Sequence, residues 1–371
     1  MWTWRQFTEC LNENIRRQIK DRWDSVAKPI DGMGEFEKIL SRIGAIRGNA
    51  DFSLDHKAVL VFCADNGIVE EGVSQSPSEV TLKVVCNMLL GRSSVAVMAK
   101  HTGAKIYIAD VGVKCGPDDI VPENKRDNSA TYLNLKIRNG SRNFAKEPAM
   151  TEEETKSAIE CGMNLVKKLS EEGTDIIALG EMGIGNTTTS TAICAALTGA
   201  STDLLTGRGA GLDDAGLKKK RDVIGNALKQ YDLKEKDAMT VLRTVGGYDI
   251  AALAGAIIGG AKYGVPIVLD GVITMTAALV ASKLEPGCLQ CCIFSHKGKE
   301  PAVALLEEEL LKEGPESGCI IDASMALGEG TGAVMMFSLL DMAMEVYTKA
   351  ARFEDLLMEQ YDRYDSSDNG R

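Results

Sequence analysis

The sequence predicts an open α/β fold, in which a parallel sheet is covered by helices on both faces. Short, strongly apolar segments alternate with longer helical patterns, and glycine or a helix-capping residue stands at each junction. Such alternation is typical of βαβ units joined by right-handed crossovers. A protein of this class binds its ligands at the carboxyl ends of the strands.

Five apolar segments are the predicted strands. They are too short and too uniformly apolar for a half-exposed antiparallel sheet, and they suit a parallel sheet buried on both faces. They lie at residues 57–65, 105–112, 174–183, 266–272 and 291–296.

Two of the helical patterns carry distinct signals. Within residues 151–173, Thr151 and Glu154 have the spacing of a capping box, which predicts the start of a helix. Residues 249–264 are rich in Ala and Gly, which predicts a helix that packs closely against the strands.

The composition limits the classes of partner. At 371 residues with 44% hydrophobic side chains, the chain can bury one large core and a smaller one. Its 53 acidic and 42 basic residues give a formal charge of −11, so nucleic acid and anionic membranes are poor candidates. Small anionic ligands stay open, because a local site can be positive in an acidic protein.

The N-terminal region lacks the apolar core of a signal peptide, and no uninterrupted apolar run reaches the ~20 residues of a membrane span. We therefore expect a soluble, cytoplasmic protein. Trp4, Phe7, Leu11 and Ile15 follow helical spacing and predict a helix that docks one apolar face.

The cysteines are scattered, as reduced thiols of a cytoplasmic protein are. Cys288 and Cys291 form a CxxC pair with Cys292 beside it, but the chain offers no second pair of the kind a zinc site requires. Structural thiols are the preferred interpretation, and we expect no metal site.

The loop after the third predicted strand has the features of an anion site. Gly183, Gly185, Asn186 and Thr187 stand between a strand and a helix, where free backbone N–H groups and the helix dipole favour phosphate. A second glycine-rich segment at residues 206–214 is suited to close over the same group.

The usual nucleotide motifs do not fit. The spacing is neither GxGxxG with a downstream acidic residue nor GxxxxGK[ST], and the acidic pair that precedes the phosphate loop of pyrophosphate-linked ribosyl transferases is missing. The residues alone indicate an α/β enzyme acting on a small phosphorylated ligand. A small-molecule kinase is an alternative against which the missing P-loop argues.

Several motifs in order give the chain a close resemblance to the nicotinate-nucleotide:dimethylbenzimidazole phosphoribosyltransferases, which make the lower-ligand nucleotide of cobamides. The resemblance runs from about Lys28 to Ala343. The matching segments are KPIDGMGEFE, ADNGIVEEGVSQSPSEVT, GEMGIGNTTTSTAICAALTG, GRGAGLDD, VGGYDIAALAGAIIGGA, PIVLDGVITMTAAL, SHKGKEPA and LGEGTGAVMMFSLLDMA.

The resemblance implies a reaction between nicotinate mononucleotide and an aromatic base, with release of nicotinate and inversion of the ribose anomeric carbon. The pyridinium leaving group carries a positive charge, so neither metal nor cofactor is expected. The enzyme must position two reactants, stabilise an oxocarbenium-like ribose and remove one proton from the incoming base.

Two glutamates receive catalytic roles from the resemblance. Glu329, between Gly328 and Gly330, matches the general base of the family's GEGTG motif. The alternative is a structural role, in which the Glu329 carboxylate interacts favourably with the dipole of the following helix. Glu181 matches a second site glutamate that assists near the ribose or supports the base; otherwise it caps the loop after its strand.

The remaining site residues are predicted to bind substrate. The loop residues Gly183, Gly185, Asn186 and Thr187, together with Gly207 and Gly209, are expected to bind the phosphate and the ribose. Asp270 is expected to hold ribose hydroxyls. Ser295 and Lys297 are candidate phosphate contacts with a solvated loop as alternative, while His296 is interpreted as a loop residue. Ser74, Gln75 and Ser76 lie in the stretch that the family uses for the accepting base.

Departures from the family pattern leave the accepting base open. Asp65, Asn66 and Gly67 stand where many members have an ADHG-type sequence, and Tyr248 and Asp249 replace the commoner Phe and Glu. Dimethylbenzimidazole, another benzimidazole, adenine and a phenol all remain candidates.

The resemblance also implies an architecture. A large Rossmann-like domain is expected over residues 51–335, with a small helical domain assembled from residues 1–50 and 336–371, where the tail from Glu359 frays. A homodimer is expected, and a heterodimer with a paralogous subunit stays open. A non-catalytic or partner-dependent subunit is the alternative function, against which the intact GEGTG motif argues.

Overall fold

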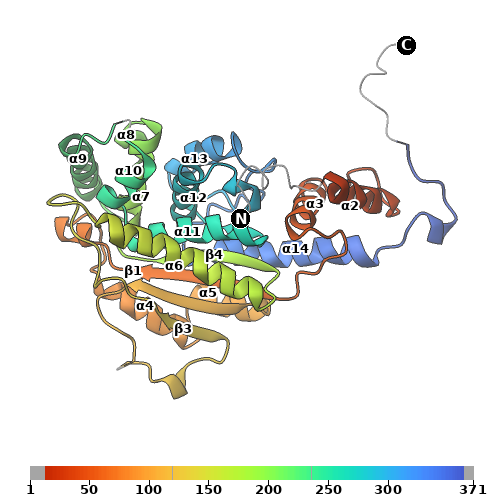
Figure 1. The fold of residues 1–371 in the computed structure, drawn as a ribbon, viewed down its shortest axis with the longest axis horizontal. Coiled ribbons are helices and arrows are strands. Elements are labelled where there is room, and N and C mark those ends of the chain that lie inside the picture. The colour runs from red at the N-terminus through yellow and green to blue at the C-terminus, as the bar shows by residue number, and fades with distance from the viewer. Residues whose placement is uncertain (1–12, 119, 235, 363–371) are drawn as a thin grey trace, which may run out of the picture.

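One six-stranded parallel sheet forms the centre of the protein, in the order β3-β2-β1-β4-β5-β6 (Figure 1). The computed structural model describes residues 13–118, 120–234 and 236–362. The strands are β1 (Lys57–Ala64), β2 (Lys105–Gly112), β3 (Ala130–Asn134), β4 (Ile176–Met182), β5 (Ile267–Leu269) and β6 (Cys292–Phe294). The predicted Rossmann-like α/β class is confirmed.

The five predicted strands all form, and β3 is an addition. Its sequence ATYLN is polar, and its residues are half-buried or exposed at the edge of the sheet. It therefore lacks the uniform apolar pattern that marks the buried strands.

The strand order reverses between β1 and β4, which are hydrogen-bonded neighbours. Their register pairs Lys57 with Ile176 and Cys63 with Met182. The segments that follow β1 and β4 therefore leave the sheet side by side, at the position where open α/β sheets bind their ligands.

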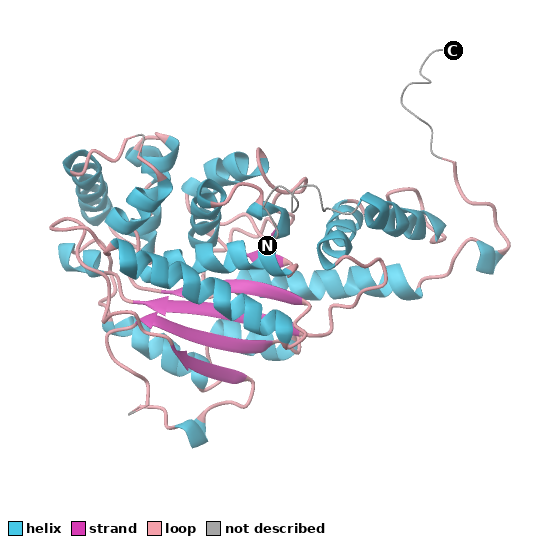
Figure 2. Cartoon of the chain, viewed as in Figure 1, coloured by secondary structure: helices cyan, strands magenta, loops and turns pink. Residues whose placement is uncertain are grey.

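Helices cover both faces of the sheet (Figure 2). The α-helices of the described residues are α2 (Glu13–Ser25), α3 (Glu35–Arg47), α4 (Glu79–Leu89), α5 (Ser94–His101), α6 (Glu152–Glu171), α7 (Asn186–Thr198), α8 (Thr202–Leu205), α9 (Asp214–Gln230), α10 (Ala238–Val245), α11 (Tyr248–Tyr263), α12 (Val272–Leu284), α13 (Ala302–Leu311) and α14 (Thr331–Lys349). Short 3₁₀ turns lie at Gly67–Glu71, Glu123–Lys125, Cys288–Cys291 and Glu354–Leu356.

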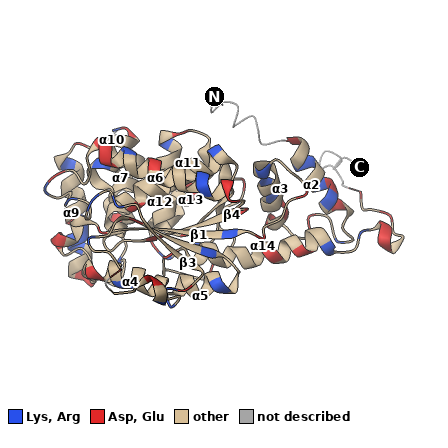
Figure 3. Ribbon diagram, turned by 60° about the horizontal axis from the view of Figure 1, so that its bottom comes forward, with Lys and Arg blue, Asp and Glu red and all other residues tan. Residues whose placement is uncertain are grey.

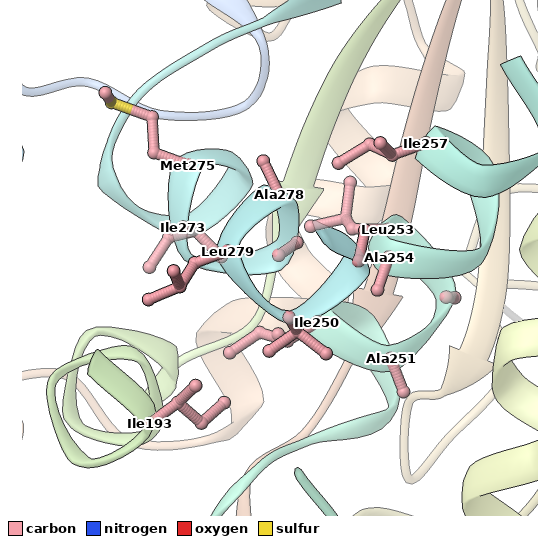
Figure 4. Packing of buried hydrophobic residues seen from close by; sticks show 14 of the residues in the cluster. Ile193, Ile250, Ala251, Leu253, Ala254, Ile257, Ile273, Met275, Ala278 and Leu279 are labelled. Carbon is pink, nitrogen blue, oxygen red and sulfur yellow. The ribbon is translucent and has the colours of Figure 1, made fainter. Parts of the chain in front are cut away.

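Alternate side chains of β1 enter two different hydrophobic clusters. Leu60 and Phe62 pack with α6, α11 and α12, whereas Val59 and Val61 pack with α4, α5 and α14. Figure 4 shows part of the first cluster, in which side chains of α7, α11 and α12 interdigitate. Burial on both faces explains the unbroken apolar pattern of the strand.

Helices α6 and α11 pack so closely that their glycines cannot be replaced without movement. A Cβ atom at Gly162 would lie 1.9 Å from the carbonyl oxygen of Ala252, and one at Gly255 would lie 1.9 Å from that of Ile159. The small-residue pattern of α11 thus serves its contact with α6 as well as with the strands. The capping box of Thr151 and Glu154 is present at the start of α6, as predicted.

The terminal helices α2, α3 and the end of α14 lie together beside the sheet (Figure 1). The rings of Trp23 and Tyr347 are 5.1 Å apart there. The predicted boundary between residues 335 and 336 falls inside α14, which is one continuous helix between the strand ends and this region. Ile15 is buried in α2, whereas Trp4, Phe7 and Leu11 lie outside the described residues.

Lys and Arg are interspersed with Asp and Glu along the outer helices (Figure 3). Among the described residues, Glu79–His101 is long and apolar enough to cross a membrane by length and composition. The structure divides this stretch into α4 and α5, and both pack in the cluster beneath the sheet. Buried helices of soluble proteins pass the same test, so the stretch is weak evidence for a membrane span; the cytoplasmic location stays a prediction.

Candidate active site

A pocket of about 240 Å³ opens at the carboxyl ends of β4 and β5. Six of the predicted site residues line it: Glu181, Gly183, Asn186, Thr187, Gly209 and Asp270. Lys299, Glu300 and the segment Met325–Gly328 form further parts of the wall. The pocket therefore lies where the topology of the sheet predicts a ligand site.

The loop between β4 and α7 has the predicted strand–loop–helix geometry. Gly185 precedes α7 with φ +96°, a left-handed conformation that favours glycine. A Cβ atom at Gly183 would lie 2.6 Å from a carboxylate oxygen of Asp249, so the loop passes directly over that buried side chain. Thr187, in the first turn of α7, points its hydroxyl toward the second glycine-rich loop, where Gly209 lies.

A buried lysine lies beneath these two loops. Lys220, on α9, is 1% exposed, and its Nζ donates to Thr187 Oγ1 at 2.8 Å and to the carbonyl oxygen of Gly207 at 3.3 Å. Both acceptors are neutral. Burial lowers the pKa of Lys220 to about 8, an effect that the Glu300 carboxylate opposes. A buried cation that is this weakly compensated is suited to an incoming anion.

The turn that carries Glu329 consists of three consecutive residues in the left-handed region. Gly328 has φ +82°, Glu329 has φ +61° and Gly330 has φ +95°. A non-glycine residue rarely adopts this conformation, and such residues concentrate at functional sites. The turn rests on β4, where a Cβ atom at Gly180 would lie 2.2 Å from the Glu329 carbonyl oxygen.

The Glu329 carboxylate points toward the start of α5 and does not line the pocket. Its Oε2 accepts a hydrogen bond of 3.2 Å from the backbone N–H of Val95. Burial raises the pKa of Glu329, whereas this N–H and the hydroxyl of Ser93 lower it. The adjacent Gly328 faces the other glutamate, since a Cβ atom there would lie 2.9 Å from Glu181 Oε1.

Glu181 belongs to a buried network of carboxyl and amide groups. The Asn186 side-chain nitrogen donates to Glu181 Oε2 and, at 3.3 Å, to Asp249 Oδ2. Burial and the Asp249 carboxylate raise the pKa of Glu181 to about 8. Burial also raises the pKa of Asp249 to about 6. In the free protein at neutral pH, Glu181 is therefore mostly protonated.

We expect Glu181→Gln to stabilise the protein at pH 8 and to change its stability little at pH 5. The raised pKa means that the folded protein holds a proton that the unfolded chain releases above its ordinary pKa of 4.5. Wild-type stability therefore falls as pH rises from about 4.5 to about 8. A neutral side chain removes this loss, which is on the order of 4 kcal/mol at pH 8 because one pKa unit corresponds to about 1.4 kcal/mol.

Urea unfolding of both proteins at the two pH values tests this expectation. Glutamine keeps a carbonyl oxygen for the Asn186 amide, so the network loses only the titrating proton. An equal difference between variant and wild type at pH 5 and pH 8 would contradict the raised pKa.

Asp270 follows β5 and is 3% exposed. Its Oδ1 accepts from the backbone N–H groups of Gly332 at 2.8 Å and Ala333 at 3.3 Å, and its Oδ2 accepts from that of Gly330 at 3.2 Å. The aspartate thus joins the end of the sheet to the Glu329 turn and to the start of α14. The predicted contact with ribose stays a prediction.

The structure does not bring the other predicted residues into the pocket wall. Ser295 is buried and its hydroxyl donates to the Leu269 carbonyl oxygen at 2.6 Å, whereas Lys297 is exposed. Gly185, Gly207, Ser74, Gln75 and Ser76 also lie outside the lining. With its nitrogen turned toward the second loop, the Gln75 amide donates to Ala210 O at 3.0 Å and Gly211 O at 3.2 Å.

Three features of the site escaped the sequence analysis. His296, which was interpreted only as a loop residue, lines the pocket and is 4% exposed. Lys220 stands in the run KKKR, which resembles the exposed face of a helix. Asp249 was noted only as a departure from the family pattern, although it contacts the Glu181 network.

The cysteine trio lies away from the pocket. Cys288, Cys291 and Cys292 are buried, and burial raises the pKa of the first two thiols. Arg42 of α3 donates to the carbonyl oxygens of Leu289 and Gln290 beside them. This environment supports the structural interpretation of the trio.

The fold and the pocket define an α/β protein with a candidate ligand site at the carboxyl ends of its parallel strands. The chain belongs to the phosphoribosyltransferase family, whose model matches residues 8–356. It is a phosphoribosyltransferase, and the family resemblance of its motifs is confirmed.

Two relatives are named nicotinate-nucleotide--dimethylbenzimidazole phosphoribosyltransferase. The protein of Acetivibrio thermocellus is 40% identical over 92% of this chain and 93% of its own length. That of Clostridium perfringens is 38% identical over 94% and 92%, respectively. Among solved structures, CobT from Thermus thermophilus has a TM-score of 0.84 at 33% identity, over 94% of this chain and 100% of that one.

Proposed function

We propose that the protein transfers the phosphoribosyl group of nicotinate mononucleotide to an aromatic base, giving nicotinate and an α-riboside 5'-phosphate for the lower ligand of a cobamide. One observation carries the proposal: a glycine-rich anion loop backed by buried Lys220 lines the same pocket as Glu181 and Gly328, the residue directly before Glu329. The names of the relatives support the two substrates.

The phosphate is assigned to the end of the pocket above Lys220. Backbone groups of Gly183 and Gly209, the Thr187 hydroxyl and the start of α7 surround this end. A phosphate dianion there compensates the buried ammonium group and restores its ordinary pKa. Helix N-termini favour anions for the same electrostatic reason.

The reaction breaks the bond between ribose C1' and the nicotinate ring nitrogen and forms a bond from C1' to the incoming base. The electron pair of the broken bond stays with nicotinate, which neutralises its pyridinium charge. Attack from the opposite face of the ribose gives the α configuration. The N–H or O–H proton of the base then needs an acceptor.

Glu329 is assigned as that acceptor and Glu181 as the group beside the ribose. Below pH 8, Glu181 is mostly protonated in the free protein, so it serves as a hydrogen-bond donor and not as a base. Glu329 lies on the other side of Gly328 and is held by the start of α5, whose N–H groups favour the ionised form. The two carboxyl groups thus divide the roles by environment.

The acceptor specificity is assigned to the neighbourhood of residues 74–76. Gln75 lies against Ala210 and Gly211, so this segment borders the second glycine-rich loop. Leu327, 53% exposed beside Glu329, adds an apolar surface for a flat ring. Benzimidazoles, purines and phenols remain the candidates.

A direct assay tests the function. The purified protein is mixed with nicotinate mononucleotide and a panel of benzimidazoles, purines and phenols, and products are identified by mass and by the coupling of the anomeric proton. We expect nicotinate and an α-riboside phosphate with at least one acceptor. No transfer to any acceptor would overturn the proposal and favour a partner-dependent subunit.

A further inference from the structure

We propose that Asp270 is a positioning residue that holds the Gly328–Gly330 turn, and thereby the Glu329 carboxylate, in place for proton transfer. The inference rests on the proposed function, in which Glu329 accepts the proton of the incoming base. It gives Asp270 a role that differs from the ribose contact expected from the sequence.

The contacts of the turn support this role. Asp270 Oδ2 accepts at 3.2 Å from the backbone N–H of Gly330, the residue directly after Glu329. On the other side of Glu329, the Thr331 hydroxyl donates to the Gly328 carbonyl oxygen at 2.9 Å and closes the turn. Because Glu329 itself adopts the unfavourable left-handed conformation, its neighbours must fix it there.

The two oxygens of Asp270 have separate partners. Oδ1 accepts from Gly332 and Ala333 in the first turn of α14, which is ordinary capping of a helix start. Oδ2 accepts from Gly330. One side chain therefore sets the position of α14 and the position of the catalytic turn relative to the same strand end.

Asp270 is itself held rigidly. It follows β5 directly, and the Ser295 hydroxyl donates to the carbonyl oxygens of Leu269 at 2.6 Å and Asp270 at 3.3 Å. His296 Nδ1 lies 3.9 Å from Asp270 Oδ1, and a Cβ atom at Gly332 would lie 1.9 Å from the same ring nitrogen. The histidine thus packs beside both Asp270 and the first turn of α14.

Asp270→Asn separates the two functions of the side chain. The amide oxygen can still accept from Gly332 and Ala333, but the amide nitrogen that replaces Oδ2 cannot accept from Gly330. We expect kcat to fall about 10- to 100-fold, since small misplacements of a catalytic group cost rates of this order, with little change in the KM for nicotinate mononucleotide. Asp110→Asn is the matched control, because Asp110 also accepts from backbone N–H groups, those of Gly112 and Val113, near the carboxyl end of another strand, β2.

A double mutant tests whether Asp270 acts through Glu329. In the Glu329→Gln background, Asp270→Asn should cost much less than its single effect, because the group that it positions is already disabled. A full additional loss of kcat, or a raised KM with unchanged kcat, would overturn the proposal; the second result would support the ribose contact instead.

Two further experiments keep the test decisive. If Asp270→Asn does not fold, Asp270→Ser, whose hydroxyl can still cap α14, should also lose kcat, and wild-type turnover by it would overturn the inference. A crystal structure of the folded variant is a test that does not depend on activity. We expect a displaced Gly328–Gly330 turn, and an unchanged turn would overturn the proposal. Failure of the wild-type enzyme to transfer any phosphoribosyl group concerns the proposed function and leaves this structural comparison valid.

Discussion

Glu329→Gln should bind nicotinate mononucleotide as the wild type does and lose most of its turnover. Glutamine has the size of glutamate and keeps an oxygen that can accept from the Val95 N–H, but it cannot take up a proton. A positioned general base contributes about 10²- to 10⁴-fold, so kcat should fall within this range. Nicotinate release measures kcat, and calorimetry measures binding.

The choice of the base that receives the phosphoribosyl group provides an internal control for this variant. An azole that is acidic enough to be an anion at the assay pH carries no proton to remove, so the loss should shrink with that acceptor. Near-normal turnover of Glu329→Gln with benzimidazole would show that another group accepts the proton.

Glu181→Gln is the matched comparison within the same site. Because the pKa of Glu181 is raised to about 8, it is mostly protonated at pH 7 and should contribute little as a base. Its loss of kcat at this pH should therefore be smaller than that of Glu329→Gln. The opposite order would exchange the roles of the two glutamates.

The sequence predicts the strands best where burial makes the pattern simple. The central strand β1 alternates its side chains between two hydrophobic clusters, so every position after Lys57 is apolar and the segment is easily recognised. The edge strand β3 has one neighbour and half-exposed residues, and its polar sequence ATYLN carries no comparable signal. Pattern alone therefore locates the centre of the sheet and not its edge.

The site divides in the same way. The loop from Gly183 to Thr187 is readable because strand, glycine and helix follow each other in the chain, whereas Glu329 required the family resemblance. The network of Glu181, Asn186 and Asp249 joins β4, α7 and α11, and no spacing in the sequence indicates that these residues meet.

Lys220 shows why such residues are missed. In the run Lys218, Lys219 and Lys220, the first two side chains are exposed and the third is 1% exposed. The three residues are of the same type and adjacent in the sequence. Only the packing of α9 beneath the Gly207 loop distinguishes Lys220 from the other two. Its burial, and not its charge, distinguishes it as a candidate phosphate contact.

Lys220→Met should change ligand binding and protein stability in opposite directions. Removing one member of a desolvated charge pair costs about 2–5 kcal/mol, so the affinity for nicotinate mononucleotide should fall roughly 30-fold to several thousand-fold. The free protein should become more stable by about 3.5 kcal/mol at pH 7, because burial lowers the pKa of Lys220 from 10.5 to about 8 and each pKa unit corresponds to about 1.4 kcal/mol.

The sign of the stability change follows from the pKa. The unfolded chain binds the lysine proton up to pH 10.5, whereas the folded protein releases it from about pH 8, so the penalty of the charged form is fully present below pH 8 and fades toward pH 10.5. Methionine has no charge to desolvate, and the gain in stability should therefore shrink at high pH. Urea unfolding at pH 7 and pH 10 measures it.

Opposite changes in ligand affinity and protein stability distinguish a ligand-binding lysine from a structural one. A lysine retained for packing or hydrogen bonding would lose stability on replacement by methionine, with binding weakened only as far as the fold is damaged. A lysine held unpaired for a phosphate is a cost to the free protein and a gain to the complex. Lys219→Met, one residue earlier on an exposed position of α9, should change neither quantity. If Lys220→Met binds nicotinate mononucleotide as tightly as the wild type does, the phosphate does not bind at this end of the pocket.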